Sequence, residues 1–349
     1  MTKIKENIQE YYGKELSSSK DLKTTACCDL TTMPNWQKKL LGQIHDEVLE
    51  KFYGCGSPIP EAILGKRVLD LGCGSGRDVY MMSKLVGENG EVIGVDMTED
   101  QLSTASKYKE YHAEKYGYGN PNMDFRHGLM EDLKSIGIED ESIDVITSNC
   151  VINLSEDKRA VFKEVFRVLK YGGELFFSDV FADRRIPEEL FHDRTLAGEC
   201  LAGALYIEDF RRLLREFGCL DYRILQKSTI NIEDEEIKNK LGMVRFYSLT
   251  IRVFKLDQHL EDLCEDYGQV ATYLGGLEHS PHEFMLDDHH VFVKNKPHLV
   301  CGNTAAMLGE TRYCDVFRIE GDRSQHFGLF DCSPLSSQND NSGTEGSCC

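Results

Sequence analysis

The chain has 349 residues, 41% of them hydrophobic and 28% charged, as is usual for a soluble globular protein with one large domain and a smaller one. Its net charge of -19 argues against a nucleic-acid partner, because that affinity comes largely from Lys and Arg neutralising phosphates. The N-terminus lacks the apolar core of a signal peptide, and no run approaches the ~18 apolar residues of a membrane helix. We therefore expect a cytoplasmic protein with no membrane partner.

Residues 1–60 are expected to form an N-terminal segment that carries the first cysteines. The first 30 residues contain too few apolar side chains for a core of their own, so they must lie on another surface or stay mobile. After Pro34, apolar residues recur every three or four positions up to Phe52, which predicts one amphipathic helix. Glycines and prolines between Gly54 and Pro60 end it.

Strands and helices alternate from residue 61 to residue 256, which predicts an α/β fold with a doubly wound parallel sheet covered on both faces. A capping box of Thr98 and Gln101 opens one helix, while another is capped by Ser155 and ends at Gly172 and Gly173. A short acidic helix separates the last two strands. This favours a hairpin-like pairing of these two strands at the end of the sheet, with a reversed strand at the edge. The expected strands cover residues 67–71, 91–95, 123–127, 143–148, 174–178, 222–226 and 244–254.

Residues 257–332 change to short segments with many turns, which predicts a smaller C-terminal α+β domain. Four histidines between His279 and His290 are interpreted as exposed loop residues, with a metal site as the alternative. Residues 333–349 are rich in Ser, Asn and Gly and are expected to form a disordered tail, although they end in Cys348 and Cys349.

A glycine loop follows the first predicted strand of this domain. Gly72, Gly74 and Gly76 permit a tight turn and close backbone approach to a ligand. Asp70, just before the turn, would repel a pyrophosphate and suits a cationic ligand such as S-adenosylmethionine. Asp96 ends the next apolar run about 20 residues further on, where an acid holds ribose hydroxyls.

In a doubly wound sheet, ligands bind beyond the carboxyl ends of the strands. There, Met97 would form an apolar wall against an adenine and Glu131 would accept from its amino group; a core methionine and a solvated acid are the alternatives. Cys150 ends a buried strand and is either a core residue or a thiol facing the cleft. Cys200 lies in a long irregular segment over the cleft mouth and is its expected partner.

Thiolates converging beside a methyl donor select a soft acceptor, and arsenic(III) has a lone pair that can attack a methyl group. The 13 cysteines of a cytosolic chain are expected to be reduced. Several of them, scattered among apolar neighbours, are interpreted as small buried hydrophobic residues. These are Cys73, Cys219, Cys264, Cys301 and Cys314.

Over about residues 8–332 the chain resembles the arsenite S-adenosylmethionine methyltransferases, a family within the class I methyltransferase superfamily. The glycine loop is shared by that whole superfamily, whereas residues 148–154 and 198–200 are specific to the family. The other segments that carry the resemblance are residues 11–13, 21–23, 53–56, 70–78, 94–97, 172–175, 177–179 and 203–206. Residues 287–290 and 301–304 resemble the C-terminal domain of longer algal and bacterial members.

The resemblance implies a Rossmann-like sheet and methylation of arsenite and methylarsenite to mono- and dimethylated arsenicals, with thioredoxin or glutathione as reductant. The family's working cysteines fall on Cys27, Cys55, Cys150 and Cys200. Cys150 and Cys200 would bind arsenic directly, while Cys27 and Cys55 join in trapping it and in a disulfide relay. Because Cys28 adjoins Cys27, it stays open which of these two cysteines acts. The family's cofactor contacts fall on Tyr53, Gly72, Met97, Met130, Glu131, Asn149 and Val151.

Two other functions compete with this one. A methyltransferase for a sterol, quinone or thiol would need a base near the acceptor and would not depend on cysteines. A protein that only binds zinc or arsenic is disfavoured because no Cys-x-x-Cys pair occurs, although Cys348 and Cys349 could pre-bind arsenic.

Overall fold

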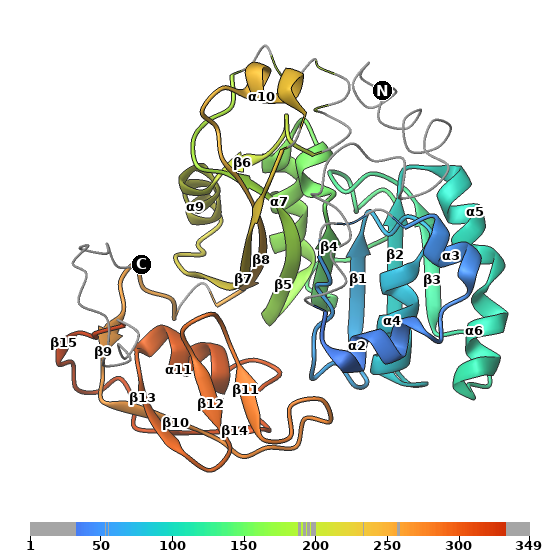
Figure 1. Ribbon diagram of the computed structural model, residues 1–349. Coiled ribbons are helices and arrows are strands. Elements are labelled where there is room, and N and C mark those ends of the chain that lie inside the picture. The colour runs from blue at the N-terminus through green and yellow to red at the C-terminus, as the bar shows by residue number, and fades with distance from the viewer. Residues whose placement is uncertain are drawn as a thin grey trace.

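The computed structural model describes residues 33–332, except residues 53, 55, 188, 189, 191, 192, 194, 195, 197–199, 233, 257 and 258. Seven strands form the main sheet in the order β3-β2-β1-β4-β5-β8-β7, and the short β6 pairs with β5 (Figure 1). The strands are β1 (Arg67–Leu71), β2 (Glu91–Asp96), β3 (Met123–His127), β4 (Ile143–Asn149), β5 (Leu169–Ala182), β6 (Leu205–Tyr206), β7 (Tyr222–Ile230) and β8 (Phe246–Phe254). The predicted doubly wound α/β sheet is confirmed.

The reversed strand lies inside the sheet and not at its edge. β8 runs antiparallel to both β5 and β7, so β8 is inserted between them and β7 forms the edge. The acidic helix that joins them, α10 (Glu235–Leu241), begins after Asp234, whose side chain accepts from the backbone N–H groups of Glu236 and Ile237.

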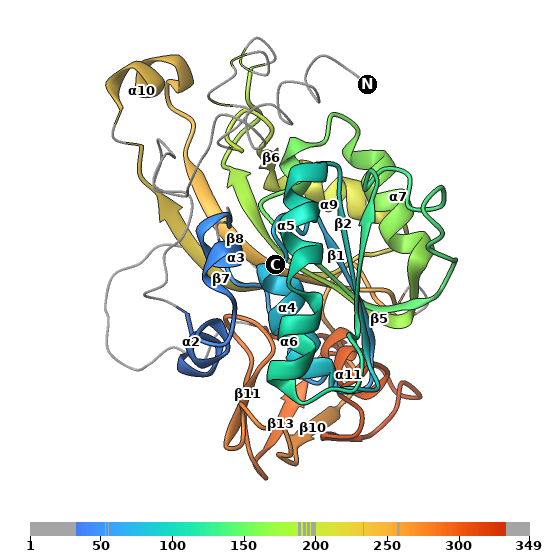
Figure 2. The same ribbon diagram turned by 90° about the vertical axis from the view of Figure 1, so that its right-hand side faces the viewer.

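Helices cover both faces of the sheet (Figure 2). Neighbouring residues of a strand point to opposite faces, so Val68 belongs to the core that α2 (Asn35–Leu41), α4 (Arg77–Val86) and α5 (Glu99–Lys107) cover, whereas Leu69 belongs to the core that includes residues of α7 (Lys158–Val168) and α9 (Ile207–Glu216). The remaining helical elements of the described part are α3 (Asp46–Glu50), α6 (Lys109–Tyr116), α11 (Gly302–Gly309) and the 3-10 turn η3 (Ile152–Leu154).

The single helix predicted after Pro34 is wrong, since the structure has two helices there. α2 ends at Gly42, and α3 starts after His45, whose Nδ1 accepts from the backbone N–H of Glu47 at 3.2 Å. The apolar spacing continues through the break because both helices pack on the same core, so the periodicity concealed the turn.

Three predicted helix ends also need correction. α5 does begin after Thr98, but without a capping box. The Thr98 side chain makes no cap hydrogen bond, and the Thr98 N–H donates to the Asp96 carboxylate at 2.8 Å, whereas in a capping box it would donate to the Gln101 side chain. Asp157, not Ser155, caps α7 by accepting from Ala160 N at 2.9 Å. α7 ends at Val168, since the chain turns directly into β5, and the predicted stop at residues 172 and 173 lies within that strand.

The C-terminal part contains a three-stranded sheet, β13-β10-β14, two short strand pairs and α11. Its strands are β9 (Glu265–Asp266), β10 (Gln269–Tyr273), β11 (Glu283–Met285), β12 (Val291–Val293), β13 (Pro297–Val300), β14 (Phe317–Glu320) and β15 (Gly328–Leu329). Its histidines are held by side chains: His279 stacks on Trp36 with ring centroids 4.3 Å apart, and His290 Nδ1 contacts the Asp287 carboxylate at 2.8 Å.

This C-terminal part packs at the end of the main sheet where β5 begins. Glu174 of β5 is fully buried and pairs with Arg252 of β8 at 2.6 Å and with Arg312 from the C-terminal part. The domain boundaries at residues 60, 256 and 332 stay a prediction, and residues 1–32 and 333–349 lie outside the described part. None of the helices within that part combines the length and apolar character needed to cross a membrane.

Candidate active site

A cleft opens at the carboxyl ends of β1, β2 and β4, the place where ligands bind in sheets of this kind. Ten of the predicted site residues line it: Asp70, Gly72, Gly74, Asp96, Met97, Met130, Glu131, Asn149, Cys150 and Val151. Gly76 is not among the lining residues. It is the N-cap of α4 and packs against the ring of Phe125, so its role lies in the helix–sheet contact.

The glycine loop brings backbone to the floor of the cleft. Gly72 has φ +68° and donates its N–H to Val95 O at 2.7 Å. A Cβ built on Gly72 would lie 2.3 Å from Val151 Cγ1, which is too close for any side chain. Gly72 is therefore required both by its backbone conformation and by its neighbour.

Asp96 connects the loop to the end of β2. Its Oδ2 accepts from Gly74 N at 2.9 Å, and its Oδ1 accepts from Thr98 N at 2.8 Å. Burial raises the pKa of Asp96, while these backbone donors oppose the rise. Asp96 lines the cleft at the end of β2, where an acid can accept from a ribose diol.

Two buried acidic side chains lie behind the loop. Burial and the neighbouring Asp78 raise the pKa of Asp70, whose Oδ1 accepts from Thr147 Oγ1 at 2.7 Å. Asp78 is paired with Arg77 at 2.7 Å and accepts from Asn149 Nδ2 at 3.0 Å. An acidic wall of this kind suits the ammonium and sulfonium groups of S-adenosylmethionine. Sequence reasoning missed Asp78, although its place in the first turn after a glycine loop was a usable signal.

The side chain of Asn149 also binds the backbone of Gly56, in the segment between α3 and β1. Its Nδ2 donates to Gly56 O at 2.9 Å, and Gly56 N donates to its Oδ1 at 3.2 Å. A Cβ on Gly56 would lie 2.5 Å from Ser178 Oγ, and Ser178 O accepts from Cys150 N at 2.8 Å. The backbone at Gly56 therefore lies against the ends of β4 and β5. Tyr53, Cys55, Cys27 and Cys28 lie outside the described residues.

Glu131 is held in place within the cleft. Its Oε1 accepts from Ser155 Oγ at 2.7 Å, and both residues line the cleft. Ser155, expected as a helix cap, instead orients this acid. That partner favours the ligand-facing interpretation of Glu131 over a freely solvated helix residue.

Cys150 and Cys200 come together next to the cleft. Their Sγ atoms and a carboxylate oxygen of Asp179 all lie within 4.8 Å of one another, and Cys200 Sγ donates to Cys150 O at 3.1 Å. Cys150 is disulfide-bonded. Cys150 and Cys200 both have left-handed backbones, with φ +58° and +60°. Such strain in a residue other than glycine concentrates at functional sites.

Two charged groups that sequence reasoning missed adjoin this sulfur pair. Asp179 accepts from Asn153 Nδ2 at 2.7 Å, and burial raises its pKa to about 7. Lys158 donates to Ser155 O at 3.0 Å; burial lowers the pKa of Lys158, and the charges of Asp179 and Cys200 oppose that shift. The position of Asp179 at the end of the fifth strand was the available signal.

A sheet of this order, with a glycine loop after its first strand and an acid at the end of its second, defines a class I S-adenosylmethionine-dependent methyltransferase. A family model described as a methyltransferase domain matches residues 64–218. An arsenite methyltransferase of Aquipseudomonas alcaligenes is 52% identical over 93% of both chains, and one of Homo sapiens is 42% identical over 90% of this chain and 84% of its own. The chain belongs to the arsenite methyltransferases.

A solved structure agrees with this assignment. The crystal structure of an arsenic(III) S-adenosylmethionine methyltransferase from Chlamydomonas reinhardtii matches with a TM-score of 0.83 and 52% identity, over 85% of this chain and 99% of that one. The alternative of another small acceptor is less favoured. A demethylmenaquinone methyltransferase of Lactococcus lactis is only 29% identical, over 70% of this chain.

Proposed function

We propose that this enzyme methylates trivalent arsenic held by Cys150 and Cys200, with Cys55 as a third ligand and Cys27 in the trapping step. The observation that carries the proposal is the approach of the Cys150 and Cys200 sulfurs to within 4.8 Å of each other beside the cofactor cleft. One thiophilic atom with bonds of about 2.3 Å, the length of a Zn–S bond, spans a pair of sulfurs ~4.6 Å apart at most. Only a small adjustment is therefore needed.

S-adenosylmethionine supplies an electrophilic methyl group: the arsenic lone pair forms the As–C bond as the S–C bond breaks, and the sulfonium leaves as a neutral thioether. Asp96 would hold the ribose, and Met97, Met130 and Val151 would pack around the adenosine. Tyr53, Asn149 and Glu131 complete the proposed contacts, with Gly72, Gly74 and Gly76 shaping the loop and Asp70 behind it. The chain's task is thus positioning, since the attacking lone pair needs no base to free it.

The disulfide at Cys150 indicates which step needs the reductant. A disulfide-bonded sulfur cannot bind arsenic, so a dithiol or thiol must first supply two electrons and release the Cys150 thiolate. Thioredoxin or glutathione fits this step, and both act in a reducing compartment, which favours the cytoplasm. Each transfer uses the arsenic lone pair and so oxidises arsenic formally by two electrons; closure of a disulfide between two of the sulfurs that bind it returns arsenic to the trivalent state, and the thiol reductant then reopens that disulfide. Arsenite and methylarsenite are the proposed acceptors in successive rounds, and mono- and dimethylated arsenicals are the products.

The test is methylation of arsenite by the reduced full-length protein with S-adenosylmethionine, read as arsenic speciation over time. Cys150→Ser and Cys200→Ser should each abolish methylarsenical formation, because serine oxygen is a hard ligand. Cys314→Ser is the matched control, since Cys314 is an exposed free thiol outside the cleft. Full activity in either of the first two variants would refute the assignment.

The reductant is tested in the same assay. Thioredoxin with its reductase, or glutathione, should sustain turnover beyond the first round, whereas a preparation without reductant should stop early. Turnover that continues with no thiol present would contradict the proposed reduction step.

A further inference from the structure

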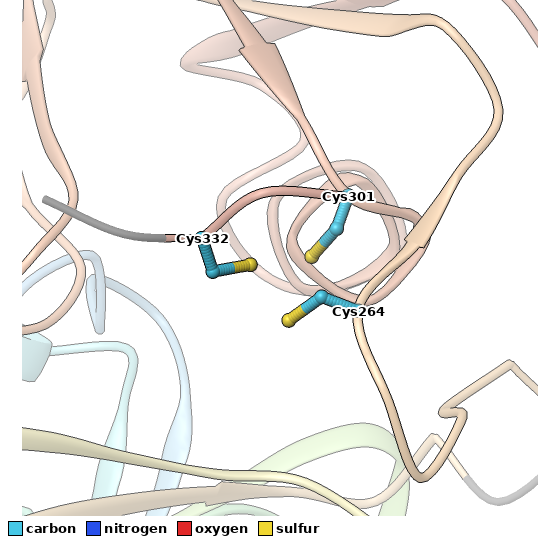
Figure 3. Close-up of side chains that lie close together, drawn as sticks. All are labelled: Cys264, Cys301 and Cys332. Atoms are coloured by element: carbon cyan, nitrogen blue, oxygen red, sulfur yellow. The ribbon is translucent and has the colours of Figure 1, made fainter. Parts of the chain in front are cut away.

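A second group of cysteines lies in the C-terminal part of the molecule. The Sγ atoms of Cys264, Cys301 and Cys332 all lie within 4.8 Å of one another, and Figure 3 shows the three side chains pointing toward a common centre. We call these residues the C-terminal thiol cluster. The expected burial is confirmed for Cys73, Cys219 and Cys301 and is wrong for Cys264, which is half-buried, and for Cys314, which is exposed. Cys264 and Cys301 are moreover members of one sulfur cluster.

Three separate chain segments build the C-terminal thiol cluster. Cys301 follows β13 and is the N-cap of α11, with its Sγ accepting from Thr304 N at 3.5 Å. Cys264 directly precedes β9, and Cys332 comes shortly after β15, which pairs antiparallel with β9. Pairing of these two short strands thus brings Cys264 and Cys332 to the start of α11. Phe330 N donates to Cys264 O at 2.8 Å and fixes that approach.

The surroundings of Cys301 favour a negatively charged sulfur at this position. The Arg223 guanidinium is buried, and its Nη2 lies 4.0 Å from Cys301 Sγ. Arg223 is held there by Asp221 at 2.7 Å and Asp287 at 3.1 Å. The backbone N–H groups at the start of α11 add partial positive charge on the same side of Cys301. Within the described part, Arg223 Nε has no hydrogen-bond acceptor.

The C-terminal thiol cluster is accessible from solvent. Cys264 and Cys332 are half-buried and line a pocket of about 900 Å³, while Cys301 is fully buried beneath them. This pocket shares no lining residue with the cofactor cleft. An ion can enter from this pocket, but it would not face the glycine loop that holds the methyl donor.

We propose that the C-terminal thiol cluster is a second binding site for trivalent arsenic, separate from the site of methylation. Arsenite bound there exchanges three hydroxyl groups for three sulfurs: three S–H bonds and three As–O bonds break, three As–S bonds form, and three waters leave. Arsenic keeps its oxidation state. The proposal uses the substrate of the family and does not depend on which cysteines carry methylation.

Three sulfurs suit arsenic better than zinc. Trivalent arsenic forms three bonds and keeps a lone pair, so the three thiolates complete its coordination. A structural zinc ion takes four protein ligands in a tetrahedron, whereas the group found among the described residues offers three. Hard cations are excluded, because thiolates select soft ions.

The experiment counts arsenic on the reduced full-length protein after incubation with arsenite and removal of the unbound fraction, by elemental analysis. Cys332→Ser should bind about one arsenic atom fewer per chain than the wild type, because serine breaks the three-thiolate set. Cys264→Ser should show the same loss, which guards against a folding defect in one variant. Cys314→Ser, an exposed cysteine of the same part, should bind as much as the wild type.

A parallel arm offers zinc chloride in place of arsenite. X-ray absorption spectra of arsenic bound to the Cys150→Ser, Cys200→Ser double variant should still show coordination by three sulfurs. Adding Cys332→Ser to this variant should remove that coordination. Unchanged arsenic stoichiometry in both Cys332→Ser and Cys264→Ser would overturn the proposal. So would stoichiometric zinc that depends on Cys332 and blocks arsenic uptake. Loss of methylation in the Cys150→Ser and Cys200→Ser variants would concern the catalytic cysteines. It would not change the difference in bound arsenic between the wild type and Cys332→Ser.

Discussion

Substituting Gly72 by alanine tests how the glycine loop is built. A Cβ at this position would lie 2.3 Å and 2.5 Å from the two γ-methyl carbons of Val151, and φ is +68°. The left-handed backbone costs an alanine about 1–2 kcal/mol. Forcing Val151 aside adds about 1–3 kcal/mol, as for other overpacked sites. Gly72→Ala should therefore lower the free energy of unfolding by about 2–5 kcal/mol.

Gly74→Ala is the matched control. Its φ is +52°, but the nearest atom to an added Cβ is Gln101 Oε1 at 3.9 Å, so only the backbone strain of about 1–2 kcal/mol applies. Urea unfolding followed by circular dichroism gives both values. In a double-mutant cycle, Val151→Ala should cost less in the Gly72→Ala background than in the wild type, by about 0.5–3 kcal/mol. Equal losses at the two glycines, or strict additivity with Val151→Ala, would refute the reasoning.

Three further predictions concern the cleft and the sulfur pair. Asp96→Asn should weaken binding of S-adenosylhomocysteine about 10- to 150-fold, the equivalent of one hydrogen bond to a charged acceptor, and calorimetry giving an unchanged Kd would contradict this. Burial holds the pKa of Asp179 at about 7, above its unfolded value, so the folded state binds the extra proton and stability falls as the pH rises from about 4 to 7, by up to ~1.4 kcal/mol per pH unit. Asp179→Asn should remove that slope in urea unfolding at several pH values, and parallel curves would contradict it. Cys200 has φ +60°, so Cys200→Gly should be as stable as Cys200→Ala or up to ~1 kcal/mol more stable, while both lose methylation; a clearly less stable glycine variant would argue against the strained backbone.

The sheet was predictable because its strands carry their own signal. Residues 67–71 and 123–127 are short apolar or alternating runs between turn residues, and their strands begin and end where expected. The cleft follows from the same signal, since parallel strands end at one edge and carry the loop and Asp96 to it. Helix caps were less predictable: the caps expected at Thr98 and Ser155 do not form as predicted, because Asp96 accepts the N–H of Thr98 and Asp157 accepts the N–H of Ala160.

The charged and sulfur groups depend on contacts between distant segments. Asp179 and Lys158 reach the Cys150–Cys200 pair through the folding of β5 and α7, which local spacing does not encode. The C-terminal thiol cluster is harder still, because residues 264, 301 and 332 are separated by more than thirty positions from each other, and two of them meet only through the pairing of two-residue strands. Such short strands have no periodicity for a sequence to show.

β5 links the two sulfur sites and also keeps them apart. At its start, buried Glu174 binds Arg252 and Arg312 and so anchors the C-terminal part to the sheet. At its other end, Ser178 and Asp179 contact the chain around Cys150 and Cys200. The five steps along the strand from Glu174 to Asp179 span ~17 Å at the rise of a parallel strand. An arsenic atom in the C-terminal thiol cluster is on the Glu174 side of this span, so it must dissociate and enter the cleft before it can be methylated.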